Sequence, residues 1–164
     1  MPKLLAAAND APLLITSLCE GVTLYKWLRQ TKIVTKELTV QILAKITKHL
    51  CEIHARGVIH NDLHADNIMI EQSDSALCVS IIDLGSASAP GKCVYSSTDK
   101  DRKDIHKYPW LAPEVLLGGP TSALCDVYSL GYLMADMAGR LPNSRVDGKE
   151  LFALSRSMMN KKQP

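Results

Sequence analysis

The chain has 164 residues, of which 46% are hydrophobic and 22% charged, and its net charge is +2. This is the balance of an ordinary globular domain, and the small net charge gives no support to a nucleic-acid or membrane-surface partner. The five cysteines contain no C-x-x-C pair, which argues against a zinc site or a disulfide framework and favours a reducing compartment. No apolar run approaches the length of a membrane span, so we expect a cytoplasmic protein.

The first elements along the chain are predicted to be two short strands. Apolar runs occupy Leu4–Ala8 and Leu13–Thr16, and the segment between them, Asn9–Pro12, has turn chemistry. We therefore expect a β-hairpin, followed after Gly21 by a short helix over Thr23–Gln30.

A long helix is predicted next, because apolar residues recur at the helical period. Thr35 can cap its start, and Gly57 can end it because glycine adopts the left-handed conformation without strain. The residues that share its apolar face are Leu38, Ile42, Ile46, Leu50 and Ile53.

Two further strands are expected after the helix, at Ile68–Glu71 and Leu77–Ile82, joined by a turn at Gln72–Ser75. The stretch from Gly85 to Lys107 shows no steady period and is rich in Ser, Gly, Lys and Asp. A loop of this length in a compact domain is usually functional, so we expect a surface loop with a role at the site.

The rest of the chain is predicted to contain a loop, an apolar helix and a tail. Pro109–Pro120 is punctuated by Pro and Gly and is expected to be a loop, whereas Asp126–Ala138 is an apolar helix closed by Gly139. The tail over 140–164 is weakly amphipathic at best.

The two later strands place three polar side chains together. Asn67 immediately precedes the first strand and Asp83 follows the second, and these positions are neighbours in an antiparallel hairpin. Both offer hard oxygen ligands that suit Mg²⁺ bound to phosphate, and Asp62 lies five residues before Asn67, where a carboxylate could accept a hydroxyl proton. Asp83 alone would most often be a turn residue, and Asn67 and Asp62 could be capping or turn residues, but the three together favour a magnesium–phosphate site.

Five segments in the same order resemble motifs of the eukaryotic protein kinase family. They correspond to the hinge, the catalytic loop H-R-D-L-x-x-x-N, the metal-binding D-F-G, the A-P-E, and D-V-W-S-x-G at the start of a buried helix. In this chain the segments are Leu14–Leu24, His60–Asn67, Asp83–Gly85, Ala112–Glu114 and Asp126–Gly131.

The resemblance implies an α+β, mainly α fold that corresponds to the large lobe of a kinase. Residues 1–18 would be a β-hairpin remnant of the small lobe together with the hinge, and residues 19–164 a truncated large lobe. The implied activity is transfer of the γ-phosphate of ATP to a protein hydroxyl with Mg²⁺. The implied partners are ATP and a protein substrate or a regulatory protein, with no nucleic acid and no membrane.

The family's template also implies the catalytic and metal-binding roles. Asp62 would be the catalytic base, and Asn67 and Asp83 would be the Mg²⁺ ligands. His64 stands where serine/threonine kinases carry a lysine that meets the γ-phosphate, and it is a third catalytic candidate.

The remaining roles concern the nucleotide and the support of the catalytic loop. By the resemblance, Thr16 is the gatekeeper, the backbone around Cys19 holds adenine, and Met69 lies beneath the adenine ring. Asp83 also belongs to this cofactor-binding set, and Asp126 would anchor the backbone of the catalytic loop.

Several residues depart from the family pattern. Asn61 replaces the arginine that pairs with a phosphorylated activation loop, and Lys107 replaces the usual threonine before A-P-E. Trp110–Glu114 leans toward the tyrosine-kinase-like branch, much of which phosphorylates serine and threonine, so serine or threonine is favoured over tyrosine.

The family's glycine-rich loop, strand lysine and partner glutamate have no counterpart in this sequence. Because phosphoryl transfer depends on positioning, we expect the chain to be orders of magnitude less active than a complete domain. The arginine that normally pairs with Glu114 is also missing, and uncovered apolar faces are expected on both lobes.

Two other functions compete with catalysis. A non-catalytic, kinase-like (pseudokinase) binding module is the main alternative, whereas a small-molecule kinase of the aminoglycoside or choline type is disfavoured by the A-P-E and D-V-Y-S-L-G segments. We interpret Trp27 and Trp110 as packing residues, and His49 and His54 as ordinary polar residues of the long helix.

Overall fold

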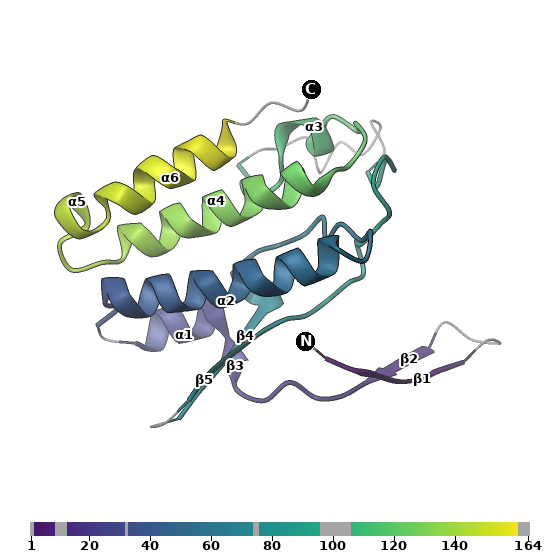
Figure 1. Cartoon of the computed structure of the whole chain (residues 1–164), viewed down its shortest axis with the longest axis horizontal. Helices are drawn as coiled ribbons and strands as arrows, with labels where there is room; N and C mark the ends of the chain where they lie inside the picture. Colours follow the sequence, from purple (N-terminus) through teal and green to yellow (C-terminus); the bar gives the residue numbers. More distant parts are fainter. Residues whose placement is uncertain (1, 9–12, 32, 74–75, 96–105, 161–164) are drawn as a thin grey trace.

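The computed structural model describes residues 2–8, 13–31, 33–73, 76–95 and 106–160. Figure 1 shows a mainly helical body from which one β-hairpin extends, the α+β architecture expected from the sequence. The elements in chain order are β1 (Leu4–Ala8), β2 (Leu13–Thr16), β3 (Val22–Thr23), α1 (Leu24–Gln30), α2 (Lys36–His54), the 3-10 turn η1 (Ala65–Asn67), β4 (Ile68–Gln72), β5 (Leu77–Ile81), α3 (Pro113–Leu116), α4 (Ala123–Gly139), α5 (Ser144–Asp147) and α6 (Lys149–Met159).

The predicted N-terminal hairpin is confirmed. Strands β1 and β2 pair antiparallel, with Leu4 opposite Thr16 and a bulge before Ala6. Leu4 and Ile15 are largely exposed, because this two-stranded sheet has no third strand within the described residues. The turn expected at residues 9–12 lies outside the described residues.

Both helices that follow begin where the sequence predicts. The Thr23 hydroxyl accepts a hydrogen bond from the amide of Lys26, and the Thr35 hydroxyl accepts one from Leu38, so each threonine caps its helix. Gly57 has a φ of +70°, which fits the predicted stop after α2. Along the predicted apolar face of α2, four of the five residues are fully buried: Ile42, Ile46, Leu50 and Ile53.

The second hairpin supplies the framework of the site. In β4 and β5, Ile68 pairs with Ile81, and the amide of Ile82 donates to the carbonyl of Asn67 over 2.9 Å. Strand β3 adds to the outer side of β4 and requires Gly21, since a Cβ there would collide with the Ile70 carbonyl. Residues 74 and 75 of the predicted turn lie outside the described residues.

The C-terminal part is more helical than predicted. Helix α4 begins at Ala123, three residues before the predicted start, because Ser122 caps it and its hydroxyl accepts from the Leu124 amide. The tail, predicted to be weakly amphipathic at best, contains α5 and α6. Helix α6 buries Leu151 and Ser155 against α4, where Gly131 leaves room for Met158.

The loop predicted over 109–120 contains one short helix, α3, with Pro113 in its first turn. It sits on a second, smaller core that includes Tyr95, Leu111 and Val115. Residues 96–105 of the predicted loop from Gly85 to Lys107 lie outside the described residues.

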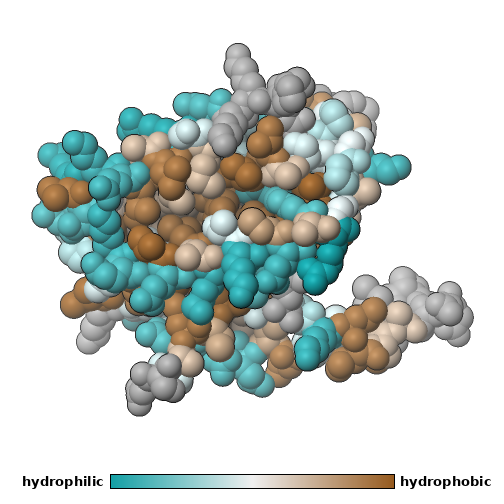
Figure 2. Space-filling view, in the orientation of Figure 1, coloured by the Kyte–Doolittle hydropathy of each residue, from teal (hydrophilic) through white to brown (hydrophobic). Residues whose placement is uncertain are grey.

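The surface of the helical body is divided between polar and apolar regions. Figure 2 shows hydrophobic residues gathered over α4, above the polar outer surface of α2. Among the described residues, no helix combines the length and apolar character needed to cross a membrane.

Candidate active site

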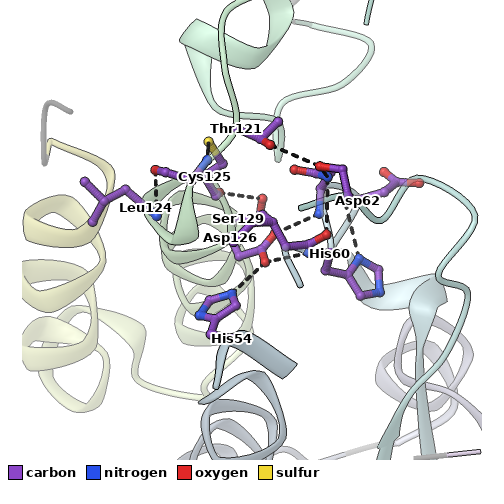
Figure 3. A network of polar contacts seen from close by, with 12 residues as sticks. His54, His60, Asp62, Thr121, Leu124, Cys125, Asp126 and Ser129 are labelled. Carbon is purple, nitrogen blue, oxygen red and sulfur yellow. Dashed lines mark hydrogen bonds and ion pairs between the residues drawn. The ribbon is translucent and has the colours of Figure 1, made fainter. Parts of the chain in front are cut away.

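The loop before η1 is anchored by a buried carboxylate from α4. Asp126 is 0% exposed, and its two oxygens accept hydrogen bonds from the amides of His60 and Asn61 over 2.8 and 2.9 Å. His54 Nε2 lies 2.8 Å from Asp126 Oδ2 on the other side (Figure 3). The anchoring role expected for Asp126 is therefore present, and His54, interpreted as an ordinary polar residue, is part of it.

Asn61 has a structural role in the same loop. Its φ is +65°, a conformation that asparagine tolerates better than most residues. Its buried side-chain amide donates to the carbonyls of Ile59 and Ser86 and to the Ser88 hydroxyl, within 3.2 Å. Asn61 thus ties this loop to the segment after Asp83.

Asp62 follows these anchored residues and keeps a partly exposed carboxylate. Its Oδ1 accepts a hydrogen bond from the indole Nε1 of Trp110 over 2.8 Å, and its Oδ2 lies 3.7 Å from Nε2 of His64. Burial on its own would raise the pKa of Asp62. The contacts with His64 and Trp110 and the nearby imidazole of His60 outweigh it, so the pKa lies below its ordinary value. The carboxylate form, which can accept a proton, is therefore favoured.

Asn67 is buried at the junction of η1 and β4. Its side-chain nitrogen donates to the carbonyl of Asp62 over 2.8 Å, so the amide oxygen is the atom left to bind another group. Its backbone is tied to Ile82 across the hairpin, one residue before Asp83. The structure thus brings the backbones of Asn67 and Asp83 to the same end of the hairpin, as the sequence predicts.

Asp83 is exposed and borders a cavity of about 830 Å³. Its φ is +61°, and its Oδ1 accepts from the amide of Gly85 over 2.9 Å. The predicted adenine-site residues Thr16, Cys19 and Met69 line the same cavity, whereas Asp62, His64 and Asn67 are not among its lining residues. The cavity therefore brings the predicted nucleotide-binding residues together around Asp83, and the other predicted site residues do not line it.

The residues present fit a magnesium ion that shares its coordination with phosphate. Asn67 Oδ1 and the Asp83 carboxylate are hard oxygen donors, the type that Mg²⁺ prefers. Among the described residues there is no group of three or more His, Cys, Asp or Glu side chains that could hold a metal. An ion here would therefore take its other ligands from phosphate and water, as Mg²⁺ does in phosphoryl-transfer sites.

The structure changes the interpretation of Glu114 and Trp110. Glu114 is only half-buried, and the Cys125 thiol lies 3.7 Å from its Oε1, so the carboxylate is not a buried charge without a partner. Trp110 packs as predicted, but it also bonds the candidate base, a role that the sequence analysis missed. No local pattern could reveal this contact, because 48 residues separate Trp110 from Asp62.

These features, which are an anchored loop, a partly exposed carboxylate and two oxygen-bearing side chains at one hairpin end, are the arrangement expected of a protein kinase domain. The family model described as the protein kinase domain matches residues 4–163. The chain belongs to the protein kinase domain family.

Curated relatives agree with this assignment. The chain is 30% identical over 133 residues to a probable serine/threonine-protein kinase of Dictyostelium discoideum, and 33% identical over 133 residues to sperm motility kinase 2B of Mus musculus. It is also 28% identical over 155 residues to the Raf homolog serine/threonine-protein kinase of Caenorhabditis elegans. These matches cover 77%, 79% and 89% of this chain but 13%, 25% and 19% of the three relatives.

Proposed function

We propose that this chain binds ATP with Mg²⁺ and transfers the γ-phosphate to a serine or threonine hydroxyl of a protein in the cytoplasm. The observation that carries the proposal is the position of Asn67, whose side chain donates to the carbonyl of Asp62 and whose backbone pairs with Ile82, next to Asp83, while Asp126 anchors the loop before Asp62. The names of the three relatives, all serine/threonine kinases or sperm motility kinases, support the reaction class. The five free cysteines fit a reducing compartment.

The residues of the chain would have separate roles in nucleotide binding, metal binding and proton transfer. The cavity lined by Thr16, Cys19 and Met69 would hold the nucleotide base, and Asp83 with Asn67 would hold the metal. Bound Mg²⁺ supplies neutralisation of the phosphate charge. Asp62 would accept the proton of the attacking hydroxyl, and its lowered pKa keeps it in the accepting form at neutral pH.

Nucleotide binding and transfer are tested separately. Asp83→Ala should abolish Mg-dependent ATP binding measured by calorimetry, because it removes the only charged oxygen ligand proposed for the metal. Asp62→Asn should leave that binding in place and lower turnover on a protein substrate by about 10²- to 10⁴-fold. Asp136→Ala, an exposed carboxylate on α4, is the control and should change neither quantity.

These measurements also distinguish a catalytic kinase from a non-catalytic binding module. Equal ATP affinity in the wild type and Asp83→Ala would contradict the metal assignment. ATP binding with no transfer by the wild type to any protein tested would instead support the non-catalytic binding module.

A further inference from the structure

The contact between Trp110 and Asp62 has an unambiguous direction. An indole nitrogen can only donate a hydrogen bond, so Nε1 of Trp110 donates and Oδ1 of Asp62 accepts, over 2.8 Å. The Asp62 side chain is 31% exposed, and a carboxylate with that much freedom would otherwise sample several rotamers. A hydrogen bond to a charged acceptor from a rigid ring restricts that sampling.

Trp110 is itself held by one contact to its backbone and two contacts to its ring. The Ser129 hydroxyl donates to the carbonyl of Trp110 over 2.7 Å. The indole lies against the His64 ring at 4.6 Å with a 36° tilt, and Tyr108 meets it edge-on at 5.7 Å and 82°. These contacts fix both the backbone and the ring plane of Trp110, so its N–H has a defined direction.

One helix controls both partners of the contact. Asp126 holds the amides of His60 and Asn61 just before Asp62, and Ser129, one turn later on α4, holds Trp110. Ser129 is 2% exposed and Asp126 is 0% exposed, so neither support depends on a mobile surface group. The relative position of the carboxylate and the indole is therefore set by the rigid face of α4.

We infer that Trp110 is a positioning residue for Asp62. Its indole holds Oδ1 of the carboxylate, so that Oδ2 faces the serine or threonine hydroxyl of the protein substrate. Oδ2 is the freer oxygen, because His64 Nε2 lies 3.7 Å from it, beyond a good hydrogen-bond length. The inference rests on the proposed phosphotransferase function. It adds that the segment before Ala112, which carries Trp110, orients the carboxylate of Asp62.

The chain contains a matched comparison for this role. Its other tryptophan, Trp27, also donates its indole N–H, but to the neutral amide oxygen of Gln72 over 3.3 Å. Trp27 belongs to the main hydrophobic core, among residues such as Leu24 and Leu28, and not to the predicted site. Removing the N–H from each tryptophan in turn therefore separates the loss of a donor at the base from the general effect of replacing a tryptophan.

The first experiment measures steady-state kinetics of the 164-residue chain with a protein substrate. Trp110→Phe keeps a ring against His64 but removes the donor, and we expect kcat to fall about 10- to 100-fold with KM for ATP unchanged. Trp27→Phe should leave kcat unchanged. A Trp110→Phe enzyme with wild-type kcat, or one in which only KM for ATP rises, would overturn the inference.

The second experiment does not need turnover. A ¹H–¹⁵N spectrum of the chain contains two indole resonances, which Trp27→Phe and Trp110→Phe assign. Asp62→Ala should move the Trp110 indole resonance upfield, because its N–H loses a charged acceptor, and should leave that of Trp27 in place.

The two readouts distinguish failure of the inference from failure of the proposed function. If the wild type shows no transfer, the proposed function fails, and the inference then depends on the spectrum alone. A Trp110 resonance that is insensitive to Asp62→Ala would overturn it, whereas a shift confined to that resonance would support the positioning contact.

Discussion

Asp126 shows how one residue organises a site made of distant segments. Its side chain lies on α4, yet it satisfies two backbone amides of the catalytic loop and contacts His54 at the end of α2. Those amides belong to the buried residues His60 and Asn61, and a buried amide left without an acceptor costs about 1–3 kcal/mol. The geometry of Asp62 therefore depends on a residue that is too deeply buried to touch a substrate.

Replacing Asp126 by alanine should reduce the free energy of unfolding by about 3–5 kcal/mol, since it leaves two buried amides and His54 without their acceptor. Urea unfolding followed by circular dichroism measures the change. Asp136→Ala is the control on the same helix, because its ion pair with Arg140 is exposed and worth about 1 kcal/mol or less. Equal losses in the two variants would contradict the anchoring role.

At the scale of elements, helix α4 positions both the catalytic loop and helix α6. It carries Asp126 and Ser129 on the side that faces the catalytic loop, and it packs against α6 through Gly131. A Cβ at Gly131 would lie about 3.0 Å from Cβ of Met158 and 3.1 Å from the carbonyl of Ser155. This close approach explains why the helix tolerates a glycine in its interior, which otherwise costs stability.

Gly131→Ala should therefore destabilise the chain by about 1–3 kcal/mol, because α6 must shift to admit the methyl group. Gly139→Ala, at the last residue of α4, has nothing within 4 Å of the new Cβ and should be neutral or slightly stabilising. Thermal and urea unfolding of both variants check this pair. Greater stability in Gly131→Ala than in the wild type would show that α6 does not pack tightly there.

The whole molecule combines a helical body with a hairpin that lies apart from it (Figure 1). The cavity near Asp83 is lined by Leu4 and Thr16 of the β1–β2 hairpin and by Met69 of strand β4. A two-stranded hairpin is marginal in water without a further layer. The β4–β5 hairpin differs because β3 extends it and α2 packs against β5.

Hydrogen exchange should reveal this difference within one experiment. Amides of β1 and β2 should exchange far sooner than those of β4 and β5, because the outer hairpin can open without disrupting the core. Mass spectrometry of peptides from the two hairpins measures the rates, and β4–β5 serves as the internal control. Equal protection of both hairpins would contradict the prediction that the β1–β2 hairpin opens independently of the core.

Local patterns in the sequence predicted most of the framework. Thr35 as a cap and Ile42, Ile46 and Leu50 as one buried face follow from the hydrogen-bonding and periodicity of a single helix. The missed helix α6 is different, since its face toward α4 includes Ser155, and its place depends on the space left by Gly131. The prediction that the tail is weakly amphipathic at best was wrong for this segment, because α6 has a clear apolar face.

The sequence by itself determined the family, the order of the motifs and the hairpin that joins Asn67 to Asp83. These depend on neighbouring residues and on the register of one short turn. Only the tertiary structure decided that Trp110 meets Asp62 across 48 residues and that His54 meets Asp126 across 72. Such pairs are set by how α4 packs against the loops and α2, and no local periodicity records that arrangement.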